Sequence, residues 1–272
     1  MNVQNILTDI TALTRNRSRA NDDGLFLHRA ALDEVEDRLS LVNRTFKRPA
    51  IVTGFPQAWG ALFPEAPVVP DADTLKLDQK AHDLVVHAMG LHWANDPVGQ
   101  IIQSRRALEP DGLFLSVSFG GQTLNELRAC LAQAEAQITG GLSPRIAPMA
   151  ELRDIGGLLQ RSDLALPVAD SVTLKTEYTD IWHLMRDLRA MGETNALQSR
   201  LRRPTRRDVF HTAAKLYQDN FATDTGRVSA TYEMIFLAGW APSGSQPKPL
   251  RPGSAQQRLA DALATNETPL SD

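Results

Sequence analysis

Three rings able to donate, accept or transfer a proton lie close together in the segment His87–Asp96: His87, His92 and Trp93. This polar segment follows a short apolar run, Asp83–Met89, which predicts a buried parallel strand. Such rings can line a pocket and take part in proton transfer, or they can simply close the top of a sheet. The sequence leaves both interpretations open, because it identifies no partner for either histidine.

Two aspartates form a second candidate group. Asp71 and Asp73 follow the apolar run Ala66–Val69, which we expect to be a strand. Open parallel sheets bind their ligands at the carboxyl ends of their strands. Asp71 and Asp73, at the carboxyl end of this strand, could therefore bind a ligand's hydroxyl or amine groups, or they could form a solvated acidic turn. Arg145, at the end of the loop Gly140–Arg145, could clamp a carboxylate or be an ordinary surface arginine.

The elements that must position these residues alternate between strands and helices. A helix over Val98–Leu108, capped by Asn95 or Asp96, lies between the strands Asp83–Met89 and Leu113–Ser118, which makes one right-handed βαβ unit. Elsewhere we expect helices over Leu25–Val42, Gln57–Phe63, Leu124–Ile138, Met149–Gln160, Ile181–Met191 and Arg207–Phe221, a turn over Glu109–Gly112, and strands over Ala50–Gly54 and, antiparallel and last, Ala230–Trp240. Leu164–Asp170 and Ser171–Tyr178 form either a strand and its extension or a pair of strands. The pattern predicts a single α/β domain.

The composition is typical of a soluble globular protein. The chain has 272 residues, of which 42% are hydrophobic and 22% charged, and a formal net charge of −3, which argues against general nucleic-acid binding. No apolar run approaches the ~20 residues that span a bilayer, and the first residues lack the pattern of a secretory signal. The single cysteine, Cys130, reads as a core residue. We therefore expect a cytoplasmic location. The six histidines form no metal-ligand pattern, so we expect no metal site.

We divide the chain into three parts. Residues 1–23 form an N-terminal arm or short helix, residues 24–241 the α/β domain, and residues 242–272 a mobile tail with a possible short helix over Ala255–Ala264. Within the domain, Glu126, Arg128 and Glu135 are expected to be solvated. The most basic stretch, Arg200–Asp208, could dock an acidic protein or form a solvated loop.

Several blocks of the sequence are similar to a known family. DLVVHAMGLHWANDPVGQIIQSRRALEPDGLFLSVSFGG, SPRIAP, LMRDLRAMGE and SQPKP resemble the class I S-adenosylmethionine-dependent methyltransferases, in particular the methyltransferase-like assembly factors of respiratory complex I and their bacterial relatives. The carrier-protein methyltransferases of biotin synthesis are a more distant neighbour. The resemblance covers about the last two thirds of the chain. It implies a Rossmann-like methyltransferase sheet, partly truncated, with added helices and a final antiparallel strand.

The resemblance assigns cofactor-binding roles to a few residues. Asp71 matches the aspartate that faces the adenine, and Gly54 matches one glycine of the first motif. The loop after the fourth strand of the family, which lines the cofactor and the substrate, corresponds here to Met89, Leu91, His92 and Trp93. The rest of the glycine motif is missing from TGFPQAWG, as is the acidic residue that grips the ribose. The short interval from Ile51 to Asp83 indicates that the second strand and its helix are lost.

Two functions follow from this resemblance. The first is an S-adenosylmethionine-dependent enzyme that acts on a protein substrate linked to respiratory complex I, where the family implies arginine hydroxylation rather than methylation. Positioning would then supply most of the rate, because the sulfonium is already an activated donor, and we identify no catalytic residue. The alternative is an inactive methyltransferase-fold assembly or scaffold factor that does not bind the cofactor. The degraded TGFPQAWG turn favours this alternative.

Overall fold

The computed structural model describes residues 6–247, 260, 261 and 265 of the 272-residue chain. The chain divides into two compact units, Met1–Pro242 and Ser243–Asp272. In the second unit, Ser243 and Gln246 close a turn in which the Gln246 N–H donates to the Ser243 carbonyl. Ala260 and Asp261 are helical, and most of the helix expected over 255–264 lies outside the described residues.

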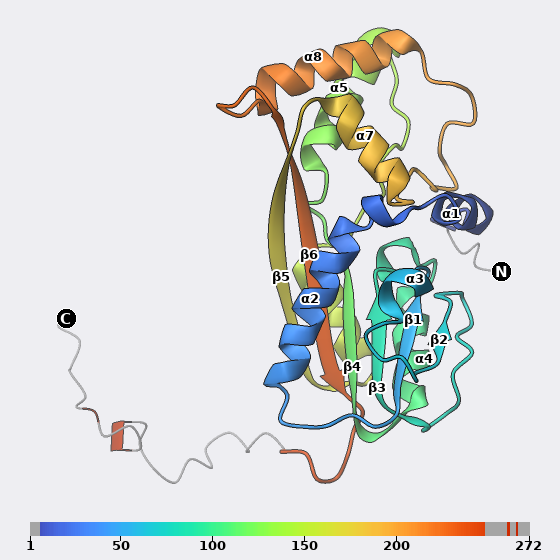
Figure 1. The fold of residues 1–272 in the computed structure, drawn as a ribbon, viewed down its shortest axis with the longest axis vertical. Helices are drawn as coiled ribbons and strands as arrows, with labels where there is room; N and C mark the ends of the chain where they lie inside the picture. The colour runs from blue at the N-terminus through green and yellow to red at the C-terminus, as the bar shows by residue number, and fades with distance from the viewer. Residues whose placement is uncertain (1–5, 248–259, 262–264, 266–272) are drawn as a thin grey trace. The chain divides into compact units, whose positions relative to one another are not determined.

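A six-stranded sheet with the order β2-β1-β3-β4-β6-β5 forms the centre of the first unit (Figure 1). The three strands β1, β3 and β4 run parallel, β2 extends them at one edge, and β6 and β5 are antiparallel at the other. The bounds are β1 Pro49–Thr53, β2 Val68–Val69, β3 His82–Ala88, β4 Leu108–Phe119, β5 Ala165–Tyr178 and β6 Val228–Trp240. The predicted βαβ unit and the antiparallel final strand are confirmed.

One expectation about the strands is wrong. Glu109–Gly112, expected to be a turn, belongs to β4, because its backbone keeps pairing: Asp111 N–H donates to the Ala241 carbonyl and Ala241 N–H to the Gly112 carbonyl. Of the two alternatives for Leu164–Tyr178, the strand with its extension is confirmed, because β5 is one strand and β6 pairs with it continuously from Val168 to Tyr178. Both segments are held by partners far away in the sequence.

Helices cover both faces of the sheet. Asp96 caps α4, as predicted, by accepting a hydrogen bond from the Gly99 N–H at 2.8 Å, and Asp180 caps α7 in the same way. The helices are α1 Ile10–Arg17, η1 Asp22–Gly24, α2 Phe26–Leu41, α3 Pro56–Trp59, η2 Leu91–Trp93, α4 Pro97–Ala107, α5 Asn125–Thr139, α6 Leu152–Arg161, α7 Ile181–Ala190 and α8 Arg207–Phe221. None of the helices in the described part of the chain is long and apolar enough to cross a bilayer.

The apolar core forms two clusters, one on each face of the sheet. Along β3, Leu84 and Val86 point to the cluster under α2, α5, α7 and α8, while Val85 points to the cluster under α4 and α6. This alternation follows from the two-residue period of a strand. Figure 1 shows α2 crossing the front of the long strands, with α5, α7 and α8 grouped at the end near α1. That end lies beyond the carboxyl ends of the parallel strands.

Two glutamates of α5 that we expected to be solvated are buried. Glu126 accepts hydrogen bonds from the N–H and the hydroxyl of Thr231, and Glu135 is bound by Ser143 and Arg145. The expectation of solvation is therefore wrong for both, because each carboxylate has partners that replace water. Cys130 lies in the core, as predicted, and burial raises the pKa of its thiol to about 11.

Candidate functional site

The residues assigned to a cofactor meet at one edge of the sheet, where β1 and β3 end. Gly54 follows β1, Asp71 follows β2, and η2, after β3, carries Leu91, His92 and Trp93. A Cβ atom on Gly90 would overlap the carboxylate of Asp71, so these loops pack directly on one another. Met89, which leads into η2, has a left-handed backbone with φ of 52°. Such strain in a non-glycine residue is found mainly at functional positions.

The space between these loops is filled by an arginine from the start of the chain. Nη1 and Nη2 of Arg17, the last residue of α1, donate to the two carboxylate oxygens of Asp71 at 2.7 and 3.0 Å. The two side chains are 9% and 7% exposed. A Cβ atom on Gly54 would overlap the same guanidinium, which also lies 5.2 Å from the centre of the Phe55 ring. Arg17 therefore touches the end of β1 and the loop after β2 at once.

This arrangement does not fit S-adenosylmethionine. By the resemblance, Asp71 would face the adenine, and the backbone after β1 would approach the ligand closely. Asp71 is instead fully paired with Arg17, and the guanidinium lies against Gly54 where the ligand would have to lie. The residues that the resemblance assigns to the cofactor are thus in contact with the side chain of Arg17.

Buried aromatic residues replace the missing glycines of the first motif. Phe55 and Trp59 are fully buried, and the indole N–H of Trp59 donates to Nδ1 of His28 at 3.1 Å. The His28 ring also packs against Phe55, with 4.2 Å between the ring centres. The side chains of the turn after β1 are thus part of the apolar core beneath α2.

The buried histidine makes the stability of the fold depend on pH. Burial lowers the pKa of His28 from 6.5 to about 4. The unfolded chain binds a proton near pH 6.5 that the folded chain excludes until about pH 4, so stability is full above 6.5 and falls as the pH drops toward 4. We expect a loss of about 3 kcal/mol across this window. Urea unfolding between pH 7.5 and 4.5 measures it.

The control is His28→Gln, which removes the titrating group and retains an acceptor for Trp59. We expect this variant to be less stable at pH 7.5 but to lose less stability on acidification. Parallel pH profiles of the two proteins would contradict the assignment to His28.

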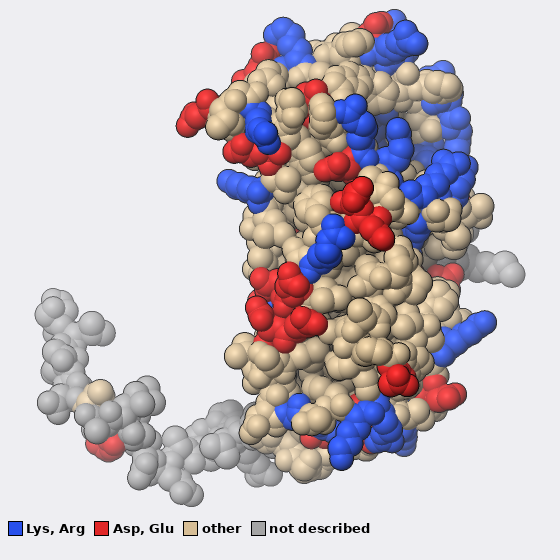
Figure 2. All heavy atoms as spheres, viewed as in Figure 1, with Lys and Arg blue, Asp and Glu red and all other residues tan. Residues whose placement is uncertain are grey.

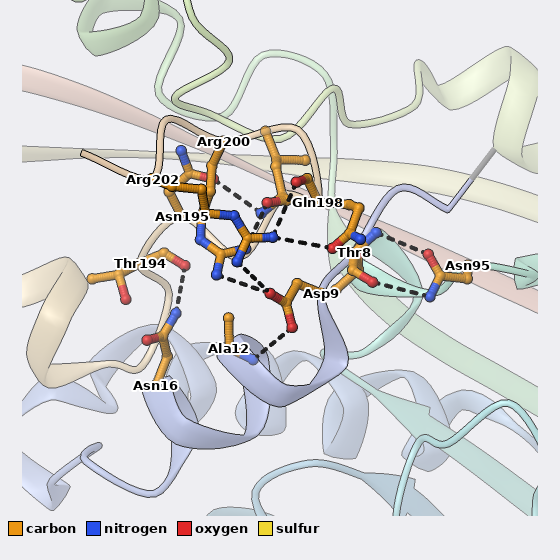
Figure 3. Close-up of polar contacts among 11 residues, drawn as sticks. Thr8, Asp9, Ala12, Asn16, Asn95, Thr194, Asn195, Gln198, Arg200 and Arg202 are labelled. Carbon is orange, nitrogen blue, oxygen red and sulfur yellow. Dashed lines mark hydrogen bonds and ion pairs between the residues drawn. The ribbon is translucent and has the colours of Figure 1, made fainter.

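The position of Arg17 depends on how the start of α1 is held (Figure 3). Asp9 caps the helix by accepting a hydrogen bond from the Ala12 N–H at 3.1 Å. The same carboxylate pairs with Arg200 at 2.9 Å and with Arg202 at 3.1 Å, both in the loop between α7 and α8. The cap bond to Ala12 and the hydrogen bond from Arg200 lower the pKa of Asp9 to about 2.

Two amides extend this attachment. The side chain of Asn16 donates to the Thr194 carbonyl at 3.0 Å, and Thr8 N–H donates to the side chain of Asn95, in the loop after β3, at 2.8 Å. Helix α1 is therefore joined both to the segment after α7 and to the loop that contains η2.

Removing the cap is expected to loosen α1. In Asp9→Ala, the amide hydrogens of α1 should exchange with solvent on the order of tenfold faster, because an uncapped helix start frays. Hydrogen exchange followed by NMR measures this. Asp23→Ala, which removes an exposed carboxylate that forms no such cap, is the matched control. Equal exchange in both variants would show that Asp9 does not hold the helix.

A cavity of about 310 Å³ opens beside η2, between α5 and α7. Its wall is mostly apolar and includes Trp93 from the predicted loop and Phe119 from the end of β4. The other apolar lining residues are Leu124, Leu127, Leu131, Ile146, Ala147, Met149, Met185, Leu188, Phe210 and Tyr232. This cavity adjoins the expected substrate side of the site, where the resemblance places the acceptor.

Glu193 supplies a buried negative charge to this cavity. Its Oε2 accepts hydrogen bonds from Trp93 Nε1 at 2.6 Å and pairs with His92 Nε2 at 3.3 Å. Burial alone would raise the pKa of Glu193, but His92, Arg17 and the Trp93 hydrogen bond outweigh it and lower the pKa to about 2. The buried Oε1 has no hydrogen-bond partner among the described residues. Glu193 therefore holds a buried, ionised carboxylate at the edge of a cavity whose lining also includes Arg145 and Arg189.

The structure separates the other sequence candidates. His87 lies within β3, where it is fully buried and bonded to Gln100 at 2.8 Å, so it packs inside the fold. Asp73 is exposed, as in a solvated turn. Arg145 binds a carboxylate, which is one of the two roles expected for it. That carboxylate belongs to Glu135 of the same chain, with 2.6 Å between Nη2 of Arg145 and Oε1 of Glu135. Within the described residues, no group of His, Cys, Asp and Glu could hold a metal ion.

The sheet order and the loops that end β1 and β3 define a class I methyltransferase-like α/β protein. In sequence, the chain resembles the arginine hydroxylases named NDUFAF5. It is 37% identical over 191 residues to Arginine-hydroxylase NDUFAF5, mitochondrial, of Dictyostelium discoideum, covering 70% of this chain and 44% of that one. The human protein of the same name is 36% identical over 192 residues, covering 71% of this chain and 55% of that one.

A bacterial relative extends the comparison. A malonyl-[acyl-carrier protein] O-methyltransferase of Xylella fastidiosa is 35% identical over 180 residues, covering 66% of this chain and 59% of that one. The chain thus spans about half the length of the curated relatives. The NDUFAF5 relatives are named as mitochondrial, which does not fit the plain cytoplasmic location that we expected. No protein-family model matches the sequence.

The chain also aligns with solved structures at low identity. The YcgJ protein of Bacillus subtilis aligns with 77% of this chain and 98% of its own, at 13% identity and a TM-score of 0.49. A phosphoethanolamine N-methyltransferase 2 of Haemonchus contortus, solved with S-adenosyl-L-methionine, aligns with 76% of this chain and 53% of its own, at 12% identity and a TM-score of 0.40.

Proposed function

We propose that this protein is a methyltransferase-fold factor that binds a protein partner in respiratory complex I assembly and does not use S-adenosylmethionine. The observation that supports this most strongly is the buried pair of Arg17 and Asp71. Because both carboxylate oxygens are engaged, the cofactor could enter only if α1 withdrew and left Asp71 without its partner. Breaking a buried ion pair of this kind costs about 3–5 kcal/mol.

The cavity beside Glu193 is the binding site in this proposal. An arginine side chain from the partner combines an apolar stem, which suits the leucine and methionine walls, with a guanidinium, whose charge is opposite to that of the buried Glu193 carboxylate. To pair with Glu193, the guanidinium must displace part of the wall, because Oε1 is buried and Arg145 and Arg189 also line the cavity. The relatives named arginine hydroxylases support the choice of arginine. The role assigned to this chain is recognition of the partner.

The second candidate is an S-adenosylmethionine-dependent enzyme acting on the same partner. The retained Asp71 favours it, since this aspartate matches the adenine-facing residue of the family. In that case α1 must move away to admit the cofactor, and Arg17 acts as a competitor of the cofactor. The two candidates differ in whether the protein with α1 in place binds S-adenosylmethionine.

A capture experiment tests the partner role. The immobilised protein is incubated with detergent-solubilised respiratory membranes, and the retained proteins are identified by mass spectrometry. We expect subunits of complex I to be retained by the natural sequence and reduced with Glu193→Gln. The exposed Glu177→Gln is the matched control. Retention of no complex I subunit, or equal retention by both variants, would contradict the proposed role.

A further inference from the structure

A second hollow lies at the other end of α5 and shares Arg145 with the cavity beside Glu193. It measures about 600 Å³ and runs between the end of α5, the loop 141–145 and the loop 201–206. We call it the arginine groove and define it by Ile138, Leu142, Arg145, Leu201, Arg203 and Arg206. The function proposed above makes no use of these residues together.

The walls of the arginine groove are fixed to one another. Glu135 accepts hydrogen bonds from the N–H and hydroxyl of Ser143 at 3.0 and 2.6 Å, and from Nε and Nη2 of Arg145 at 3.0 and 2.6 Å. The remaining Nη1 of Arg145 donates to the hydroxyl of Thr205 at 2.9 Å. Helix α5 and both loops therefore meet at one buried ion pair, so the groove is held open before a ligand arrives.

The charge of this surface is positive. The segment Arg202–Asp208 contains four arginines and one aspartate, although the whole chain carries a formal charge of −3. Arg145 already neutralises Glu135, and the side chain of Arg203 has no ion-pair partner among the described residues. Figure 2 shows blue side chains gathered at the upper right of the molecule, over the segment that leads into α8 in Figure 1.

Two details add to the attraction for an anion. Arg206 pairs with Asp208 at 3.2 Å, but both side chains are more than 60% exposed, so the pair is worth about 0–1 kcal/mol and can be exchanged for another carboxylate. Arg206 is also the residue before α8, and no side chain caps that helix. The N-terminal N–H groups of α8 therefore add positive potential beside the exposed Arg203 and Arg206.

The groove also presents an exposed apolar side chain. Leu142 is 71% exposed, and it stands between the arginine groove and a smaller hollow of about 340 Å³ beside Arg128 and Pro144. Ile138 and Leu201 lie partly buried in the wall. A ligand that matched this surface would carry carboxylates together with a bulky apolar residue.

We infer that the arginine groove binds an acidic protein segment, with its carboxylates on Arg203 and Arg206 and an apolar side chain on Leu142. A protein is favoured over a nucleic acid because the positive charge is confined to one groove of a chain with net negative charge. Exposed leucine adds an apolar contact that a phosphate backbone would not use. The groove adjoins the cavity at Glu193, because Arg145 lines both of them.

Fluorescence anisotropy with a labelled peptide of sequence Glu-Glu-Asp-Leu-Glu-Glu-Asp tests this inference. We expect saturable binding that weakens about tenfold in the double variant Arg203→Glu, Arg206→Glu, and that also weakens as salt screens the exposed charges. The control double variant Arg153→Glu, Arg161→Glu makes the same charge change on the exposed side of α6 and should bind as the natural sequence does.

Two further arms examine the apolar contact and the class of ligand. Leu142→Ser, or a peptide with serine in place of leucine, should bind about threefold more weakly. A single-stranded ten-nucleotide RNA should compete poorly with the peptide. The inference is overturned if the peptide does not bind, if the α6 control loses as much affinity as the groove variant, or if the RNA competes as well as an unlabelled peptide.

Discussion

Replacing Arg17 with methionine is expected to lower the free energy of unfolding by about 3–5 kcal/mol. Methionine keeps most of the apolar stem but leaves the carboxylate of Asp71, 7% exposed, without its partner. An uncompensated charge in this position costs far more than a lost surface pair. Urea unfolding followed by circular dichroism at pH 7.5 measures the change.

Two variants make this result specific. Arg19→Met removes an exposed arginine two residues further along and should change the stability by less than about 0.5 kcal/mol. The double variant Arg17→Met, Asp71→Leu removes both charges and should recover most of the loss, because an apolar pair of similar volume can replace a buried ion pair. If Arg17→Met is as stable as Arg19→Met, the buried pair does not exist in solution.

Glu193→Gln is expected to weaken the binding of an arginine side chain on the order of 100-fold, or about 2–3 kcal/mol. Glu193 is a buried carboxylate in the lining of the cavity, and glutamine replaces its charge with a neutral amide. Calorimetry with N-acetyl-arginine amide measures the effect. Because the pKa of Glu193 is lowered to about 2, binding to the natural sequence should not change between pH 5 and pH 8.

N-acetyl-norleucine amide is the matched ligand, since it has the apolar stem without the guanidinium. Its weak binding should be the same for the natural sequence and for Glu193→Gln. Glu177→Gln, an exposed glutamate on β5, should leave both ligands unaffected. A loss of affinity for both ligands in Glu193→Gln would mean that the substitution disturbs the cavity wall and that Glu193 does not bind the guanidinium.

Much of the fold could be predicted because its patterns are local. The apolar runs of β3 and β4 and the polar loop and helix between them lie in one stretch of about 40 residues. The capping residue Asp96 lies three residues before Gly99, from whose N–H it accepts a hydrogen bond. The antiparallel placement of β6 was also correct. The turn expected over Glu109–Gly112 failed because a proline and a glycine favour a turn locally, whereas hydrogen bonds to Ala241, directly after β6, keep the segment in the sheet.

The site could be predicted only in part, because its decisive contacts are long-range. The sequence identified Asp71, but its partner Arg17 lies 54 positions away in a stretch that reads as a polar arm. Trp93 was identified as a loop ring, whereas Glu193 is 100 positions away and belongs to a block, LMRDLRAMGE, to which the sequence assigned no chemistry. The signal that could have identified Glu193 was its place in the LMRDLRAMGE block, because the side chain of a glutamate that follows an amphipathic helix can point into the core.

Isothermal titration calorimetry of the natural sequence with S-adenosylmethionine at pH 7.5 tests the proposal that the protein does not use this cofactor. We expect no saturable heat up to about 1 mM ligand, because both carboxylate oxygens of Asp71 are already bonded to Arg17. Saturable binding in the micromolar range that disappears in Asp71→Asn would contradict it, and would show that α1 withdraws to admit the cofactor.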